Sequence, residues 1–221
     1  FGYVMIPAHS IGGEFVELIK LSEDRHIFII GSLSGKGISA SMSMVILKSV
    51  IRTYLVETSD FKLLVQKVNH FIRAHLPLGT FFAGVFALMD FSTDTLFYVN
   101  CGTPALFMYN RTYNNIVEIQ GDGRVLGFVE DVSNLVKVKK IKLGKGDMIL
   151  ACTSGLLTST SLRGEMFGRE RVQNLMMENM TFPAERMAQF TYDALVKFAS
   201  KELSDDVSII VMKYFGDIEA I

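Results

Sequence analysis

The 221-residue sequence contains only two cysteines, four histidines and four prolines, and it has no tryptophan. Cys101 and Cys152 each lie in an apolar stretch without a second cysteine or a histidine at ligand spacing, which disfavours a zinc site or a disulfide framework and fits a reducing cytoplasm. We expect no signal peptide, and no apolar run reaches the roughly 18 residues that a membrane-spanning helix requires. We therefore expect cytoplasmic location and no membrane contact by this sequence, even where it forms part of a membrane-anchored protein.

The charge is nearly balanced, with 22 Lys and Arg against 23 Asp and Glu, so the chain has no general attraction for nucleic acid. The most basic segment, residues 134–143, alternates lysines with apolar residues and predicts a strand with one solvated face. Hydrophobic residues make up 49% and charged residues 20%, a globular composition. We expect residues 1–221 to form one domain. Because the sequence begins with Phe1 instead of methionine, we expect that domain to be excised from a longer regulatory protein.

Apolar periodicity predicts an α+β chain. Strands are expected at residues 3–6, 15–21, 26–33, 80–90, 95–101, 105–110, 134–143, 147–153 and 206–215. Helices are expected at about 38–58, 61–76, 168–179 and 184–201, the second capped by Asp60. Strands that follow one another in blocks, interrupted by two pairs of helices, indicate antiparallel sheets with helices packed outside. Most methionines, Met42 and Met176 among them, are expected to fill the core.

Eight short motifs occur along the chain at turns and strand ends. They are Gly-Gly-Glu-Phe-Val-Glu at 12–17, Ser-Leu-Ser-Gly-Lys-Gly at 32–37, Cys-Gly-Thr-Pro at 101–104, Leu-Gly at 126–127, Gly-Asp at 146–147, Thr-Ser-Gly-Leu at 153–156, Phe-Gly at 167–168 and Asp-Asp-Val-Ser at 205–208. In this order and over essentially the whole length, the series resembles the metal-dependent PPM (PP2C-like) serine/threonine phosphatases of the stage II sporulation protein E family. The resemblance implies a four-layer αββα sandwich of two antiparallel sheets flanked by helix pairs.

The resemblance also implies a reaction. In this family two divalent ions, manganese or magnesium, polarise a water that attacks a phosphoserine or phosphothreonine. The family's metal ligands carry over to Glu14, to the backbone carbonyl of Leu33 and to Asp205, with Asp206 beside it as a weaker candidate. These residues are the metal-ligand candidates of the chain.

Two acidic positions of the family hold hydroxyls here. Ser32 stands in place of the bridging aspartate, and Ser154 in place of the aspartate of Thr-Asp-Gly. A serine hydroxyl does not bridge two hard cations at neutral pH, so the sequence predicts no tightly bound metal pair. Two family histidines are replaced as well, by Lys36 and Thr103. Lys36, at a helix start, is a candidate contact for phosphate.

Three hypotheses follow. The first is a catalytically silent or impaired phosphatase fold that binds a protein partner in bacterial partner switching, such as a phosphorylated anti-sigma antagonist. The resemblance adds a possible homodimer, with residues 38–58 as an apolar surface. The second is an active phosphatase with a single ion on Glu14, Asp205, Asp206 and possibly Glu17, although Glu17 is first of all expected at the surface. The third is a phosphate or small-molecule sensor built on Lys36. A serine hydrolase is disfavoured, because no histidine accompanies Ser32 or Ser154 in a triad-like order.

Overall fold

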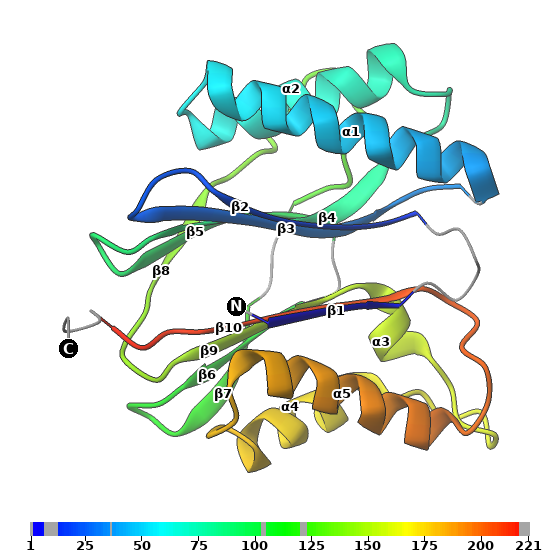
Figure 1. Ribbon diagram of the computed structural model, residues 1–221. Helices are drawn as coiled ribbons and strands as arrows, with labels where there is room; N and C mark the ends of the chain where they lie inside the picture. The colour runs from blue at the N-terminus through cyan, green and yellow to red at the C-terminus, as the bar shows by residue number, and fades with distance from the viewer. Residues whose placement is uncertain (1, 7–12, 36, 103–104, 120–122, 217–221) are drawn as a thin grey trace. The chain divides into compact units, whose positions relative to one another are not determined.

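The computed structural model describes residues 2–6, 13–35, 37–102, 105–119 and 123–216, with the backbone alone considered for 2–6 (Figure 1). The chain divides into two compact units. Unit 1 comprises residues 1–9, 104–120 and 142–221, and unit 2 comprises residues 10–103 and 121–141. Each unit is therefore assembled from separate stretches of the chain. The expectation that residues 1–221 act as one domain stays a prediction.

Unit 2 is a five-stranded sheet with two helices on one face (Figure 1). Its strands, in spatial order, are β2 (Glu14–Lys20), β3 (Arg25–Leu33), β4 (Phe82–Asp90), β5 (Thr95–Cys101) and β8 (Lys139–Lys142). The pairs β2–β3, β3–β4 and β4–β5 are antiparallel. Helices α1 (Gly37–Glu57) and α2 (Phe61–His75) cover the sheet, and the core between them includes Phe15, Ile29, Leu47, Val68 and Phe86.

Unit 1 is a second five-stranded antiparallel sheet with its own helices. Its strands, in spatial order, are β1 (Gly2–Ile6), β10 (Val207–Lys213), β9 (Met148–Cys152), β6 (Ala105–Asn110) and β7 (Asn115–Ile119). The helices are α3 (Ser154–Thr158), α4 (Gly168–Glu178) and α5 (Ala184–Ala199). Phe107, Leu150, Met187, Leu195 and Ile209 are among the residues of its core. The two antiparallel sheets with their helices confirm the α+β prediction.

Local sequence signals explain the clearest helix, α2. The carboxylate of Asp60 accepts a hydrogen bond of 3.0 Å from the backbone N–H of Leu63, which satisfies one of the free donors of the first turn. The buried face follows the 3.6-residue period and is formed by Leu64, Val65, Val68 and Ile72 with Asn69. The predicted cap is confirmed.

Four sequence-based expectations need correction. The strand expected at 134–143 is limited to β8, because the backbone turns at Val132, whose carbonyl accepts from the N–H of Val136 at 2.8 Å. Strand β7 and the short helix α3 were not predicted. Met42, expected in the core, is 60% exposed, whereas Met176 is buried as expected. Among the described residues, none of the helices is both long enough and apolar enough to cross a membrane.

Candidate functional site

Glu14 and Ser32 lie opposite each other in unit 2. They are register partners in the antiparallel pair β2–β3, so their side chains share one face of the sheet. The Glu14 side chain is buried, with 7% of the residue exposed, and Ser32 is half-buried. Folding therefore places the candidate carboxylate of Glu14 next to the hydroxyl of Ser32, as the predicted site requires.

The backbone carbonyl of Leu33 lies against the start of the same strand. The Leu33 N–H donates to the Gly13 carbonyl at 2.9 Å, and the Ser32 hydroxyl lies 3.5 Å from the Leu33 carbonyl oxygen. A Cβ atom on Gly13 would come within 2.7 Å of that oxygen, closer than side chains are found. Glycine at position 13 thus allows the close approach that keeps Leu33 beside Glu14.

In unit 1 the motifs at 153–156 and 205–208 lie together. The Thr153 N–H donates to the Ser208 carbonyl, and the Ser208 N–H donates to the Thr153 hydroxyl, both at 3.0 Å. A Cβ atom on Gly155 would come within 2.1 Å of the Asp206 carbonyl oxygen, so only glycine fits there. Two segments about fifty residues apart in the sequence are joined in this way.

The charged candidates of unit 1 flank this junction. Ser154 is exposed at the first residue of α3, Asp205 is exposed, and Asp206 is half-buried just before β10. Each unit thus carries an acidic candidate close to one of the two serines, Ser32 or Ser154, that the sequence analysis singled out. Among the described residues, no three His, Cys, Asp or Glu side chains group closely enough to hold a metal ion.

Glu17 is not a surface residue, and its expected exposure is wrong. It is 9% exposed, and its carboxylate pairs with the Lys48 Nζ at 3.2 Å and with the Arg52 guanidinium at 2.5 Å, both from α1. Lys48 also donates to the Val16 carbonyl at 3.1 Å. The signal was present in the strand period, because Glu17 follows Phe15 by two residues and therefore lies on the same face of β2, toward the helices. These contacts fix α1 on the strand that begins with Glu14.

Other motifs have structural roles. Asp147 is 2% exposed, and its carboxylate accepts from the N–H groups of Arg111 and Gly144, both at 2.8 Å, which closes the predicted turn. Gly127 has a φ of 102°, and its N–H donates to the Asn69 side chain at 2.8 Å. The calls on Lys36 and Thr103 fall on residues outside the described part of the chain.

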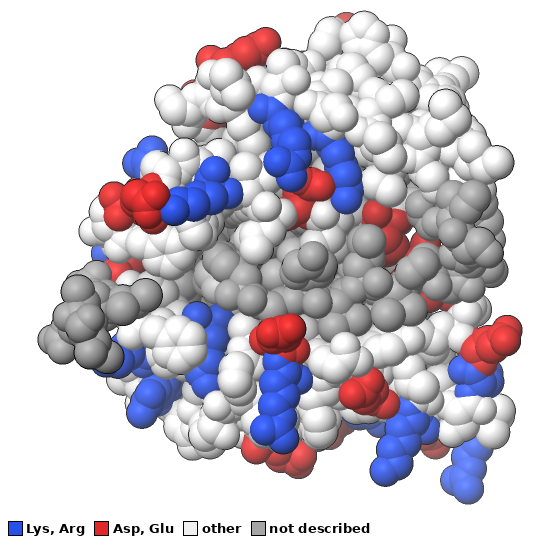
Figure 2. Space-filling view, viewed as in Figure 1, with Lys and Arg blue, Asp and Glu red and all other residues white. Residues whose placement is uncertain are grey.

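Helix α1 exposes an apolar face. Ile38, Met42, Val45 and Ile46 are 66, 60, 57 and 46% exposed, and with Ser41 they line a groove of about 340 Å³. Figure 2, viewed as Figure 1, shows no charged side chain over the first half of this helix. We call these four residues the α1 apolar face. A contiguous exposed apolar surface of this kind is typical of a protein interaction site.

Comparison with known proteins agrees with the geometry. The family model of stage II sporulation protein E (SpoIIE) matches residues 22–215. The chain is 27% identical over 213 residues to the phosphoserine phosphatase RsbU of Bacillus subtilis, covering 96% of this chain and 62% of RsbU. It therefore spans less than two thirds of that relative's length.

Solved structures share the fold. The PP2C phosphatase domain of SpoIIE from Bacillus subtilis, solved with a fragment of its regulatory domain, matches with a TM-score of 0.82 and 14% identity, over 95% of this chain and 61% of that chain. The SiaA-PP2C domain of Pseudomonas aeruginosa matches with a TM-score of 0.83 and 16% identity, over 96% of this chain and 85% of that chain. The fold is thus of the PP2C type. Since the family model covers most of its length, the chain belongs to the stage II sporulation protein E family.

Proposed function

We propose that this chain is a regulatory module with a phosphatase fold, inactive or severely impaired as an enzyme, that binds a protein partner. The observation that carries the proposal is the presence of Ser32 and Ser154 where the family has aspartates. Two divalent cations held within about 4 Å need bridging carboxylate charge, and a neutral hydroxyl does not offset their repulsion. Glu14 and Asp205, with Asp206 and the Leu33 carbonyl, are too few anionic donors for a manganese or magnesium pair.

The partner is proposed to be a protein of a bacterial partner-switching pathway, such as a phosphorylated anti-sigma antagonist. The relationship to RsbU and SpoIIE supports this class of partner. The α1 apolar face supports a protein contact, either with that partner or with a second copy of the chain. We further propose that residues 1–221 act as one domain in the cytoplasm.

A manganese titration tests the loss of the metal pair. Isothermal calorimetry of the whole chain with manganese, with hydrolysis of a generic phosphate ester measured in parallel, should give no tight two-site binding and no metal-dependent turnover. Tight binding of two ions together with metal-dependent turnover would overturn the proposal.

The double variant Ser32→Asp with Ser154→Asp sharpens this test. Restoring both carboxylates should restore manganese binding, because each adds a negative charge and a hard oxygen donor. The control is Ser22→Asp with Ser49→Asp, which adds the same charge at exposed serines outside the motifs. Equal manganese binding by both double variants would mean that added charge alone is responsible and would count against a decayed site.

The second candidate function is an active phosphatase with one ion. The 27% identity to a phosphoserine phosphatase over 96% of this chain favours it. Glu14, Asp205 and Asp206 would then hold a single manganese or magnesium ion, with water completing its coordination. One-site binding with turnover that Glu14→Gln abolishes would establish this alternative.

Phosphate binding by Lys36 is a separate proposal: thermal stabilisation by inorganic phosphate should disappear in Lys36→Ala.

A further inference from the structure

A pocket of about 530 Å³ lies in unit 2, and its lining does not include Glu14 or Leu33, the metal-ligand candidates of that unit. It is bounded by the β2–β3 turn, the β4–β5 turn and the connection between α1 and α2. Its floor is apolar and includes Ile27, Leu64 and Leu88, of which the first two are almost fully buried. The volume falls within the range of small-molecule pockets, about 300–1,000 Å³.

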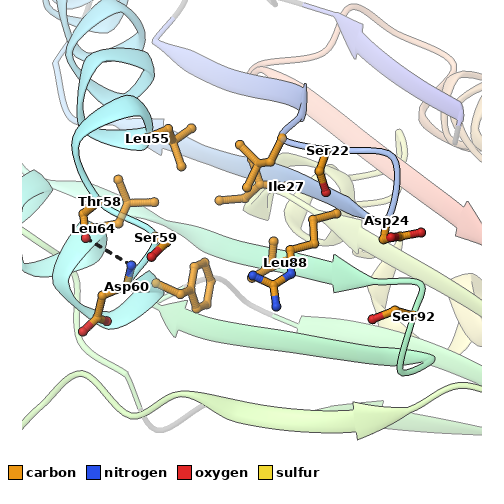
Figure 3. A pocket seen from close by; sticks show the side chains of 13 residues that line it. Ser22, Asp24, Ile27, Leu55, Thr58, Ser59, Asp60, Leu64, Leu88 and Ser92 are labelled. Carbon is orange, nitrogen blue, oxygen red and sulfur yellow. Dashed lines mark hydrogen bonds between the residues drawn. The ribbon is translucent and has the colours of Figure 1, made fainter.

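The rim of this pocket is polar, and its hydroxyl and carboxylate groups are arranged differently. Figure 3 shows Ser22 and Ser59 at opposite rims, with Ile27 between them. In the same view the carboxylates of Asp24 and Asp60 point outward, away from the middle of the pocket. Apart from Arg25, which also lines the pocket, the groups nearest a bound molecule would therefore be hydroxyls and apolar side chains.

Arg25 provides the cationic side chain of the lining. Its Nε donates at 3.1 Å to Asp90, which is 4% exposed, and no further partner of the Arg25 side chain is found among the described residues. Asp90 is held in turn by the N–H of Ser92 at 3.1 Å and by the Ser92 hydroxyl at 2.5 Å. One edge of the guanidinium is thus anchored, and its terminal amino groups remain for a ligand.

The charges decide the class of ligand. A charge-assisted hydrogen bond to a guanidinium acts at contact distance, whereas exposed acids such as Asp24 and Asp60 are screened by water and salt. For a bound anion, attraction by the Arg25 guanidinium therefore exceeds repulsion by the outward-pointing carboxylates. A phosphate dianion would require more than one cation, and Arg25 is the single cation among the described residues of the lining. A carboxylate matches the fork of one guanidinium, and an apolar body matches the floor.

We propose that this pocket binds a small organic carboxylate with an apolar body. The carboxylate accepts hydrogen bonds from the terminal amino groups of Arg25, and the body covers Ile27, Leu64 and Leu88. Asp90 is a positioning residue that holds the guanidinium at the pocket wall. Because the lining includes Leu55 of α1 and Asp60 at the start of α2, a bound ligand connects both helices to the β2–β3 turn. The site is independent of the metal-ligand candidates.

Three matched probes test the ligand class on the isotope-labelled whole chain, with methyl resonances followed by NMR. They are 3-phenylpropionate, 3-phenylpropanol and 3-phenylpropylammonium, which share one body and differ in charge. We expect saturable shifts at Ile27, Leu64 and Leu88 with 3-phenylpropionate, at least tenfold weaker binding of the alcohol, and no saturable binding of the ammonium ion. Equal affinity for the alcohol and the carboxylate, or shifts confined to other residues, would overturn the proposal.

Two variants test the residues. Arg25→Gln should weaken 3-phenylpropionate at least tenfold, while Arg169→Gln should leave it unchanged. Arg169 is a close control, since its Nε pairs with Glu118 at 3.0 Å and its side chain is 53% exposed, against 51% for Arg25. If Arg25→Gln does not fold, Ser22→Phe narrows the pocket from its rim and changes neither residue of the Arg25–Asp90 pair. Undiminished binding by the folded variant would refute the site.

Discussion

Helix α5 of unit 1 and the first half of helix α1 of unit 2 differ in how they bury their apolar residues. In unit 1, α5 turns its apolar stripe inward and buries Met187, Ala188 and Leu195. In unit 2, the first half of α1 buries the small residues Ala40 and Ser43 and leaves the α1 apolar face exposed. Because apolar residues lie on all sides of the first half of α1, only part of them can meet the sheet. Apolar residues at helical spacing therefore lie in the core in α5, whereas many of those in the first half of α1 lie at the surface.

The largest expected loss of stability concerns what the two helices share, a leucine buried against the sheet. Leu195 in α5 and Leu47 in α1 are both fully buried against their sheets. Truncating either to alanine should lower the free energy of unfolding by about 3 kcal/mol, because a cavity replaces buried methyl groups. Urea denaturation measures the change. A loss below about 1 kcal/mol for Leu47→Ala alone would mean that α1 is not packed on its sheet as described.

The next effect compares Gly155 of unit 1 with Gly13 of unit 2, each of which lies close to a backbone carbonyl of the candidate site. Gly155→Ala should cost about 2 kcal/mol, because its Cβ would meet the Asp206 carbonyl at 2.1 Å. Gly13→Ala should cost less, about 1 kcal/mol, because the Leu33 carbonyl lies at 2.7 Å and can shift slightly. Thermal unfolding of both variants gives the order. The reverse order would show that the segment around Asp206 yields more easily than β3.

Glu17→Gln tests the ion pairs that hold part of α1 on its sheet in unit 2. It should lower the free energy of unfolding, because it removes the charge that pairs with Lys48 and Arg52. The loss should be about 1.5 kcal/mol, below that of a fully buried pair because the Arg52 side chain is 56% exposed and can be solvated. Chemical denaturation at low and high salt measures it. Glu23→Gln is the control, since its pair with Lys20 is exposed and should leave stability unchanged.

A smaller effect concerns pH. The hydroxyl of Ser92, followed by the Arg25 guanidinium, holds the pKa of Asp90 below its usual range. The ionised Asp90 therefore contributes its full share to the free energy of unfolding above the unfolded-state pKa of about 3.9. That share is lost as the pH falls through the lower pKa of the folded state. Asp90→Asn should lower the free energy of unfolding by about 1 kcal/mol at neutral pH. The difference in this free energy between the variant and the parent should shrink below about pH 4. A difference that is constant from pH 7 to pH 3 would contradict this origin.

The smallest expected effect completes the comparison between the helices. Ile46→Ser on the α1 apolar face should change the free energy of unfolding by less than about 0.5 kcal/mol, in contrast to Leu47→Ala. Self-association measured by analytical ultracentrifugation should decrease if a second copy covers this face. A large loss of stability in the isolated chain would show that Ile46 packs within the unit.

The sequence alone determined most of the secondary structure, the order of the motifs and the residue types at the candidate site positions. Period-two and period-3.6 patterns, the cap at Asp60 and the serines at positions 32 and 154 are local features, readable without coordinates. Strand β7 and helix α3 were missed, because each is only five residues long and carries little periodic signal.

Only the tertiary structure decided which faces are covered and which distant residues meet. The pairs Glu17–Arg52 and Arg25–Asp90 join residues 35 and 65 positions apart. Such contacts depend on how strands and helices pack, and side-chain chemistry alone does not select them. The exposed face of α1 follows from this packing, because a helix that is apolar on several sides can bury only the side that meets its sheet. The pocket beside Arg25 also follows from it, because it forms where the strand turns meet the connection between α1 and α2.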